Sequence, residues 1–130
     1  ILTVDKILVD ISGKTTVYSV ESDDENVTSA KINDKETDID QFKSFYQYIL
    51  TCPTSEIYSE GHDKDCFLSI EIKAGSGGDK LEFFKDTTTE RKAVVKLNGV
   101  TSFRIPIKWT EKFVKNVSLL AQGKEVEESY

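Results

Sequence analysis

The chain has no methionine, only two prolines and two cysteines, and a single histidine, His62, in 130 residues. Any Ser-His-Asp or Cys-His catalytic arrangement would have to be built around that one position. His62 lies in the polar stretch 60–66, whose composition predicts an exposed turn, whereas a general base needs a rigid, partly desolvated position. His62 and Cys66 also lack the second half of any zinc-ligand spacing. We therefore expect no enzymatic activity and no metal site.

Long hydrophobic runs and clustered positive charge are also missing. No apolar stretch approaches the roughly 20 residues of a membrane-spanning helix, so we expect no membrane span in this segment. The formal net charge is −6, and the basic residues form no recognisable nucleic-acid-binding pattern, so we expect no nucleic acid partner. Because the chain begins at Ile1 and contains no methionine, we expect a fragment of a longer protein or a processed chain.

Two kinds of stretch that invite a cofactor interpretation do not support one. The acidic stretches 23–26 and 33–40 lack the turn glycine and the distal glutamate of an EF-hand, so they are predicted to be a loop and a helix cap. The glycine stretch 75–78 lacks the Gly-Lys-Ser/Thr end of a phosphate-binding loop and joins two predicted strands. It is predicted to be a hairpin turn, and we expect no cofactor.

Alternation of apolar and polar residues predicts seven strands and one further short strand. The predicted strands are 7–11, 15–20, 27–32, 68–72, 81–84, 93–97 and 100–105, with the short one at 56–59. Gly13-Lys14 is a predicted turn. Asn98-Gly99 is the strongest hairpin signal in the chain, because both central residues of a type I′ turn need a positive φ.

The first three of these seven strands and the last four are each followed by a predicted amphipathic helix. Asp38 is the predicted N-cap of the first helix, with Gln41 at the capping-box position, and the apolar stripe ends before Pro53. The second stripe begins at Trp109 and ends before Gly123, a suitable residue for the position after a helix C-cap. The acidic tail 124–130 is predicted to be frayed.

The two halves of the chain match in order. Residues 7–11 correspond to residues 68–72 at an offset of 61, and the offset rises to 68 at the pair Phe45 and Phe113. This pattern favours an internal duplication, although units of three strands and a helix are common enough to match by coincidence. We predict one α+β domain over residues 1–130. Its two β-β-β-α repeats, about 5–52 and 67–123, are joined by a connector, 53–66, and form a largely antiparallel sheet with both helices packed against it.

Cys52 and Cys66 bracket this connector. In an exported protein they could close a 15-residue loop with a disulfide worth about 3 kcal/mol in the chain-entropy model. In a cytosolic protein they would be two small buried thiols. The residues alone leave both alternatives open.

The layout resembles a bacterial family, domain of unknown function 4340. The resemblance covers nearly the whole chain as a pattern without a signature motif, and the cysteine pair departs from it. It is carried by Lys6-Ile-Leu-Val-Asp-Ile-Ser-Gly-Lys-Thr-Thr-Val-Tyr-Ser19, the helix 39–49, the hairpin 68–84 and the closing strand and helix 100–120. The resemblance implies an extracytoplasmic part of a membrane-anchored protein, often encoded near transporter components, with no assigned catalytic residues.

Together, these observations predict a non-enzymatic, extracytoplasmic accessory domain that binds a protein partner, for which a membrane transporter component is a candidate. The parent chain would be anchored through a segment outside this sequence. The alternative is a small-ligand or glycan-binding module. In that case Tyr48 and Tyr58 are the candidate stacking platforms, because Tyr46 and Trp109 lie at core-like spacing on the two helices.

Overall fold

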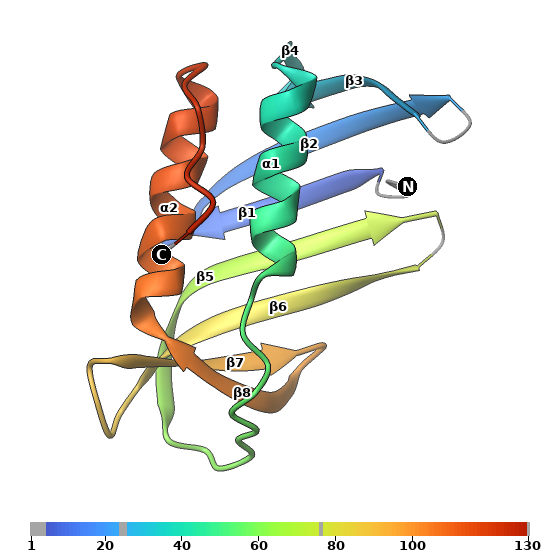
Figure 1. The fold of residues 1–130 in the computed structure, drawn as a ribbon. Coiled ribbons are helices and arrows are strands. Elements are labelled where there is room, and N and C mark those ends of the chain that lie inside the picture. The colour runs from blue at the N-terminus through green and yellow to red at the C-terminus, as the bar shows by residue number, and fades with distance from the viewer. Residues whose placement is uncertain (1–4, 24–25, 76, 130) are drawn as a thin grey trace.

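One eight-stranded antiparallel sheet and two helices make up the fold (Figure 1). The computed structural model describes residues 5–23, 26–75 and 77–129. The elements are β1 (Lys6–Ile11), β2 (Lys14–Asp23), β3 (Asn26–Ile32), β4 (Lys35–Glu36), α1 (Ile39–Leu50), β5 (Asp63–Ala74), β6 (Gly77–Asp86), β7 (Lys92–Leu97), β8 (Val100–Pro106) and α2 (Ile107–Ala121). The predicted α+β class and antiparallel sheet are confirmed.

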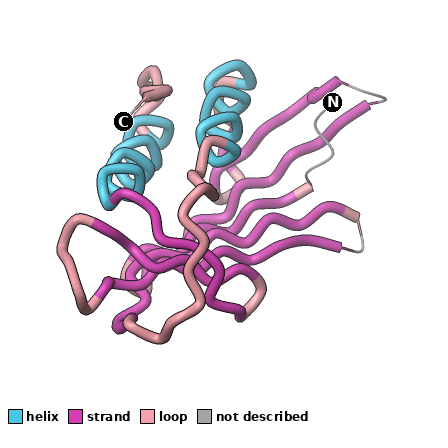
Figure 2. The backbone as a smooth tube through the Cα atoms, turned by 60° about the horizontal axis from the view of Figure 1, so that its bottom comes forward, coloured by secondary structure: helices cyan, strands magenta, loops and turns pink. Residues whose placement is uncertain are grey.

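The strands follow the order β4-β3-β2-β1-β5-β6-β7-β8 across the sheet. Four strands and a helix are followed by four more strands and a second helix, and β1 and β5 pair at the centre. Both helices lie on the same face of the sheet (Figure 2). No helix in the described ranges is long and apolar enough to cross a membrane.

The core lies between the helices and the sheet, where alternate strand residues face the two apolar helix stripes. Phe42 and Phe45 of α1 and Trp109 and Phe113 of α2 are fully buried. The Trp109 ring stacks on Phe83 of β6 with a centroid distance of 5.5 Å. Burying one such side chain contributes roughly 1.5–3 kcal/mol, so these aromatic residues hold the helices on the sheet.

The structure differs from the predicted strands at the connector, at β4 and at β5, and β2 and β6 are longer than predicted. The strand predicted at 56–59 is a single bridge between Ile57 and Phe103, and the unpredicted β4 is too short to show periodicity. β5 begins at Asp63, inside the predicted connector, because its polar first residues pair with the end of β6. The start of β5 shows that backbone pairing can extend a strand into residues whose side chains do not predict one.

The turns and the helix ends follow local chemistry. Asn98 and Gly99 have φ values of 51° and 84°, which confirms the predicted type I′ hairpin. The first hairpin turns at Ser12-Gly13, one residue earlier than predicted, where the carboxylate of Asp10 accepts a hydrogen bond from the Gly13 N–H at 2.8 Å. The Asp38 carboxylate caps α1 by accepting from the Gln41 N–H at 2.9 Å, as predicted.

The prediction that the tail is frayed is wrong for residues 124–129, and residue 130 lies outside the described residues. Gly123, with φ 71°, ends α2 in a Schellman turn in which the Lys124 N–H donates to the Leu119 carbonyl at 2.9 Å. The turn sends the chain back along the helices, and Val126 is only 5% exposed. The acidic composition misled the prediction, because the Glu127 carboxylate is paired with lysines of α2.

Candidate functional site

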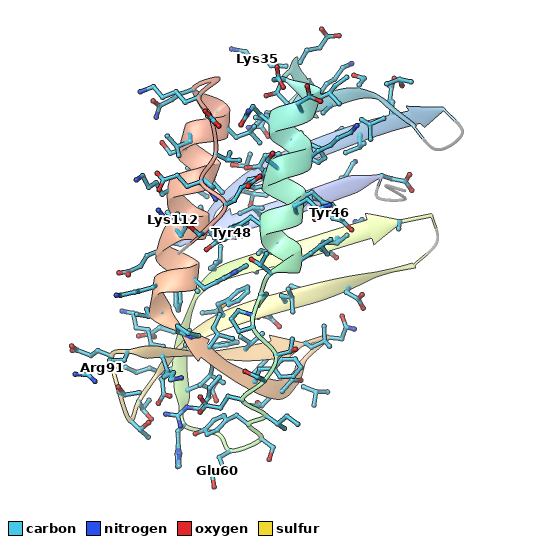
Figure 3. The ribbon with its side chains drawn as sticks, in the orientation of Figure 1. Lys35, Tyr46, Tyr48, Glu60, Arg91 and Lys112 are labelled. Carbon is cyan, nitrogen blue, oxygen red and sulfur yellow. The ribbon has the colours of Figure 1, made fainter. Side chains whose placement is uncertain are left out.

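Tyr48, one of the two predicted stacking platforms, belongs to the core. It is 1% exposed and stacks on Trp109 at a centroid distance of 5.1 Å. Its hydroxyl donates a hydrogen bond to the Trp109 carbonyl at 2.8 Å, and Figure 3 shows Tyr48 between the two helices. The predicted ligand contact at Tyr48 is therefore wrong, because α2 covers the side of α1 from which this ring projects.

Tyr58, the second predicted platform, is half-buried beside the outer edge of β8. The Arg104 guanidinium lies 4.8 Å from the centre of its ring, a distance typical of a cation–π contact. The Tyr58 hydroxyl and His62 Nδ1 form a hydrogen bond at 2.9 Å. Neighbours within the chain thus already occupy the face and the hydroxyl of this ring, and ligand stacking at Tyr58 stays a prediction.

Arg104 is the centre of a polar cluster that sequence analysis missed. Its guanidinium binds the Asp86 carboxylate through Nη2 at 2.6 Å and Nε at 2.8 Å. The Asp86 side chain has no exposed surface and also accepts hydrogen bonds from the N–H and the hydroxyl of Thr88 at 2.7 and 2.6 Å. Burial raises the pKa of Asp86, but the hydrogen bonds from Thr88 and Arg104 outweigh it and lower that pKa.

The same cluster holds the connector against the outer edge of β8. The Glu56 carboxylate accepts a hydrogen bond from Lys92 Nζ at 2.8 Å, and its other oxygen lies 3.4 Å from Arg104 Nη1. The Glu56 carbonyl accepts from the Arg104 N–H, and the Tyr58 N–H donates to the Ser102 carbonyl, both at 3.0 Å. We call Glu56, Tyr58, Asp86, Lys92 and Arg104 the connector clamp. The two acidic and two basic side chains of the clamp neutralise one another. Their contacts attach the connector to β8. The weak sequence signal for it was an arginine placed between two apolar strand residues.

His62 lies at the exposed end of the connector. Its Nδ1 is 3.5 Å from the Glu60 carboxylate, and 54% of its side chain is exposed. Within the described ranges, His, Cys, Asp and Glu side chains form no group of three or more that could hold a metal ion. The expectations of no catalysis, no metal and no cofactor stay predictions.

Cys52 and Cys66 are both free thiols in this structure. Cys52 follows α1 and packs against the helix-covered core, where burial raises the pKa of its thiol to about 12. Cys66 is exposed in β5, where it pairs with Phe84 of β6. The structure does not form the disulfide that sequence analysis left open, since one thiol faces the core while the other lies on the surface.

The other candidate stretches serve as turns and caps. Residues 33–40 form the β3–β4 turn, β4 and the start of α1, as the cap interpretation of that stretch requires. Residues 24 and 25 of the acidic loop 23–26 lie outside the described residues. In the glycine stretch 75–78, residue 76 lies outside the described residues, and β6 already begins at Gly77, inside the predicted turn.

An apolar strip continues on the helix-bearing face beyond the helices. Cross-strand pairing of Leu81 with Leu97 and of Leu97 with Val100 puts these three residues on the face that carries the core. Phe103 lies on the same face, because it pairs with the buried Val95, and Ile57 bridges to Phe103. Val100 is 65% exposed and Ile57 is 82% exposed. We call these five residues the open apolar strip.

Comparison with models of known protein families, with curated proteins and with solved structures finds no match for this chain. The fold by itself defines an α+β protein in which two helices cover one face of an antiparallel sheet. The resemblance to the family of domain of unknown function 4340 stays a prediction.

Proposed function

We propose that this chain is a non-enzymatic accessory domain that docks a protein partner on the open apolar strip. The carrying observation is that Ile57 and Val100 are two of the three large apolar side chains exposed among the described residues, and both lie on this strip. Leu81, Leu97 and Phe103 extend it as half-buried residues. Contiguous exposed apolar surface with a polar rim is typical of a protein-binding site.

The rim of the strip is polar and ordered by the chain itself. The Asn98 side-chain amide donates to the Asp79 carboxylate at 3.0 Å, beside Val100. The Asn98 side-chain oxygen accepts from the Lys80 N–H at 2.8 Å. These contacts hold the β7–β8 hairpin that presents the apolar side chains, so a partner would meet a preformed surface and lose little conformational entropy in binding it.

Site-specific photo-crosslinking tests the docking site. A photoreactive phenylalanine analogue at position 57 or 100, introduced into the chain in its native host, is expected to yield one discrete crosslinked protein. The same analogue at Lys73, which lies in the same sheet and is exposed, is the matched control. Equal crosslinking at position 73, or none at 57 and 100, would refute docking on the strip.

We further propose that the domain works on the outer side of a bacterial membrane, anchored through a segment outside this sequence, with a transporter component as the candidate partner. This placement is supported by the family resemblance in layout alone. Protease treatment of intact host cells should degrade the domain while leaving a cytoplasmic marker whole. Full protection in intact cells, with degradation after lysis, would place it on the other side.

Two structural relationships support the proposal that the halves are repeats. Under the offset of 61, Val9 corresponds to Ile70, and these two residues are direct partners in the central β1–β5 ladder. A self-complementary contact about a two-fold axis requires such a centre. The flanking pairs, Ile7 with Ile72 and Ile11 with Leu68, exchange under the same offset.

The second relationship is a hydrogen-bond pattern that occurs once in each half. Asn33, with φ 47°, accepts from the Val17 N–H at 2.9 Å through its side chain and donates its own N–H to the Val17 carbonyl at 2.8 Å. Asn98, with φ 51°, makes both contacts with Lys80, each at 2.8 Å. If the halves are repeats, exchanging the side chains at positions 9 and 70 should leave the melting temperature nearly unchanged. A fall of many degrees would count against their equivalence.

A further inference from the structure

The tail segment, residues 124–129, lies between the two helices, and we call the surface that it contacts the groove. That surface is made by Gln41 of α1 and by Lys112, Lys115 and Asn116 of α2. The segment leaves the Schellman turn at Gly123 and runs back along α2 beside α1 (Figure 1). Lys112 of α2, labelled in Figure 3, is ion-paired with Glu127 of this segment. One apolar side chain of the segment, Val126, is buried. The segment therefore packs on both helices through contacts with Gln41 of α1 and Asn116 of α2.

Two amide side chains, one buried and one half-buried, form hydrogen bonds with the backbone of this segment. Asn116 Nδ2 donates to the Glu127 carbonyl at 2.8 Å, and the Glu127 N–H donates back to Asn116 Oδ1 at 2.9 Å. Gln41 Oε1 accepts from the Val126 N–H at 2.9 Å. Asn116 is fully buried, and a buried amide without partners would cost about 1–3 kcal/mol. The groove is thus chemically complete only when an extended chain lies in it.

Side-chain contacts add selectivity at two adjacent positions. Val126 is buried, while the next residue, Glu127, places its carboxylate between two lysines of α2. Glu127 contacts Lys112 and lies 2.5 Å from Lys115. Hydrogen bonds from Lys112 and Lys115 lower the pKa of Glu127 to about 2. The groove therefore holds a small branched apolar residue followed directly by an acidic one.

We propose that this groove is a recognition site for an extended segment of a partner protein that carries a β-branched apolar residue followed by glutamate, and that the tail segment occupies it as an intramolecular competitor. This site is separate from the open apolar strip and does not depend on the function proposed for it. Because a tethered ligand has an effective concentration in the millimolar range, a partner segment binds well only when the tail is displaced.

The test uses the full chain with its own tail released by Val126→Ser and Glu127→Ser, so that every residue of the groove remains. A fluorescent peptide with the sequence of residues 124–129, Lys-Glu-Val-Glu-Glu-Ser, is titrated in a fluorescence anisotropy assay. We expect the released chain to bind it at least about tenfold more tightly than the wild-type chain, because the competitor is gone. A released chain with a native circular dichroism spectrum that does not bind the peptide would overturn the proposal.

Matched variants test the chemistry of recognition. A peptide with Glu127→Lys should bind at least about tenfold more weakly, and Lys112→Ala in the released chain should weaken the original peptide similarly. Lys108→Ala is the control, since Lys108 is exposed on the same helix, and it should have no effect. Equal binding of the two peptides would overturn the proposed selectivity.

Two further measurements keep the proposal testable. If the released chain does not fold, peptide added to the wild-type chain in excess over the millimolar effective concentration of the tail should displace the tail. The NMR signals of the chain's own Val126 and Glu127 amides should then shift, and unshifted signals would overturn the proposal. A concentration-dependent dimer of the wild-type chain that Val126→Ser and Glu127→Ser abolish would show that a second copy supplies the segment. That result would overturn the assignment to a partner protein.

Discussion

Asn116 and Glu127 exchange two hydrogen bonds, from the side-chain amide of one to the backbone carbonyl of the other and back, at 2.8 and 2.9 Å. This pairing explains a polar residue in the apolar stripe of α2, at the spacing of Phe113 and Leu120. The buried amide is satisfied by the backbone of the tail segment, which the sequence presents as an acidic and unremarkable end.

The first prediction concerns the stability that this pair contributes. Asn116→Ala leaves the backbone groups of Glu127 without their partner and should lower the free energy of unfolding by about 2 kcal/mol. Gln122→Ala, which removes an exposed hydrogen bond to Ser118 near the end of the same helix, should cost less than about 0.5 kcal/mol. Urea denaturation measures both, and equal losses would show that the tail contributes no stability.

The second prediction is the pH dependence of tail docking. The pKa of Glu127 is lowered from 4.5 to about 2, so its pairing with Lys112 and Lys115 is complete above pH 4.5 and is lost as the pH falls towards 2. NMR titration of the Glu127 carboxyl should show this low midpoint. Lys112→Ala or Lys115→Ala should move the midpoint up towards 4.5. A wild-type midpoint near 4.5 would contradict the ion pairs.

The third prediction concerns Tyr18, whose hydroxyl is the one buried side-chain polar atom without a hydrogen-bond partner among the described residues. Burial raises the pKa of Tyr18, and its ring lies 5.0 Å from Phe45 between centroids. Tyr18→Phe keeps the ring and removes the unsatisfied hydroxyl, so it should stabilise the fold by about 1 kcal/mol. Tyr46→Phe, on a half-buried ring, should change little. A lower melting temperature for Tyr18→Phe would mean that the hydroxyl has a partner.

The fourth prediction separates the buried and the exposed members of the connector clamp. Asp86→Ala leaves the Arg104 guanidinium without its buried partner and should cost about 3 kcal/mol of unfolding free energy. Lys92→Ala removes an ion pair with Glu56 in which both side chains are more than one third exposed. It should therefore lower the unfolding free energy by less than about 1 kcal/mol. Chemical denaturation compares them. Similar losses would show that Asp86 and Arg104 contribute no more than a surface pair.

The fifth prediction concerns the two thiols. Burial raises the pKa of Cys52 to about 12, and only the thiolate reacts readily with disulfide reagents. Cys66 is exposed, so a thiol reagent at pH 8 should modify Cys66 first and Cys52 only after unfolding. Intact mass before and after reduction is expected to be the same. A difference of two hydrogens in oxidised material would establish the disulfide instead.

Local patterns were enough to predict most elements of the fold. Alternation in 7–11 and 68–72 predicted the two strands that meet at the centre of the sheet, and Asp38 and Gly123 marked helix ends that the structure confirms. These local patterns predict the structure correctly because an N-cap, a positive φ and a two-residue period depend only on neighbours within a few positions.

The candidate site was predicted less well, because burial depends on what covers a residue. Tyr46 was predicted to lie on the core stripe and Tyr48 off it, but Tyr48 follows Phe45 by three positions and shares its face. The position of α2 then buries the Tyr48 ring on Trp109. Asp86 and Arg104 are 18 positions apart and become a buried pair only when β6, β7 and β8 align. No local signal predicts such a pair.

The sequence by itself determined the class of the fold, seven of the strands, the two helices and the turn at Asn98-Gly99, because short-range periodicity and backbone preference specify them. Only the tertiary structure decided that Tyr48 is core, that the connector is clamped by Arg104 and that the acidic tail occupies the helix groove. These outcomes depend on long-range contacts, in which a charged or polar residue becomes buried only if the folded chain places a matching group beside it.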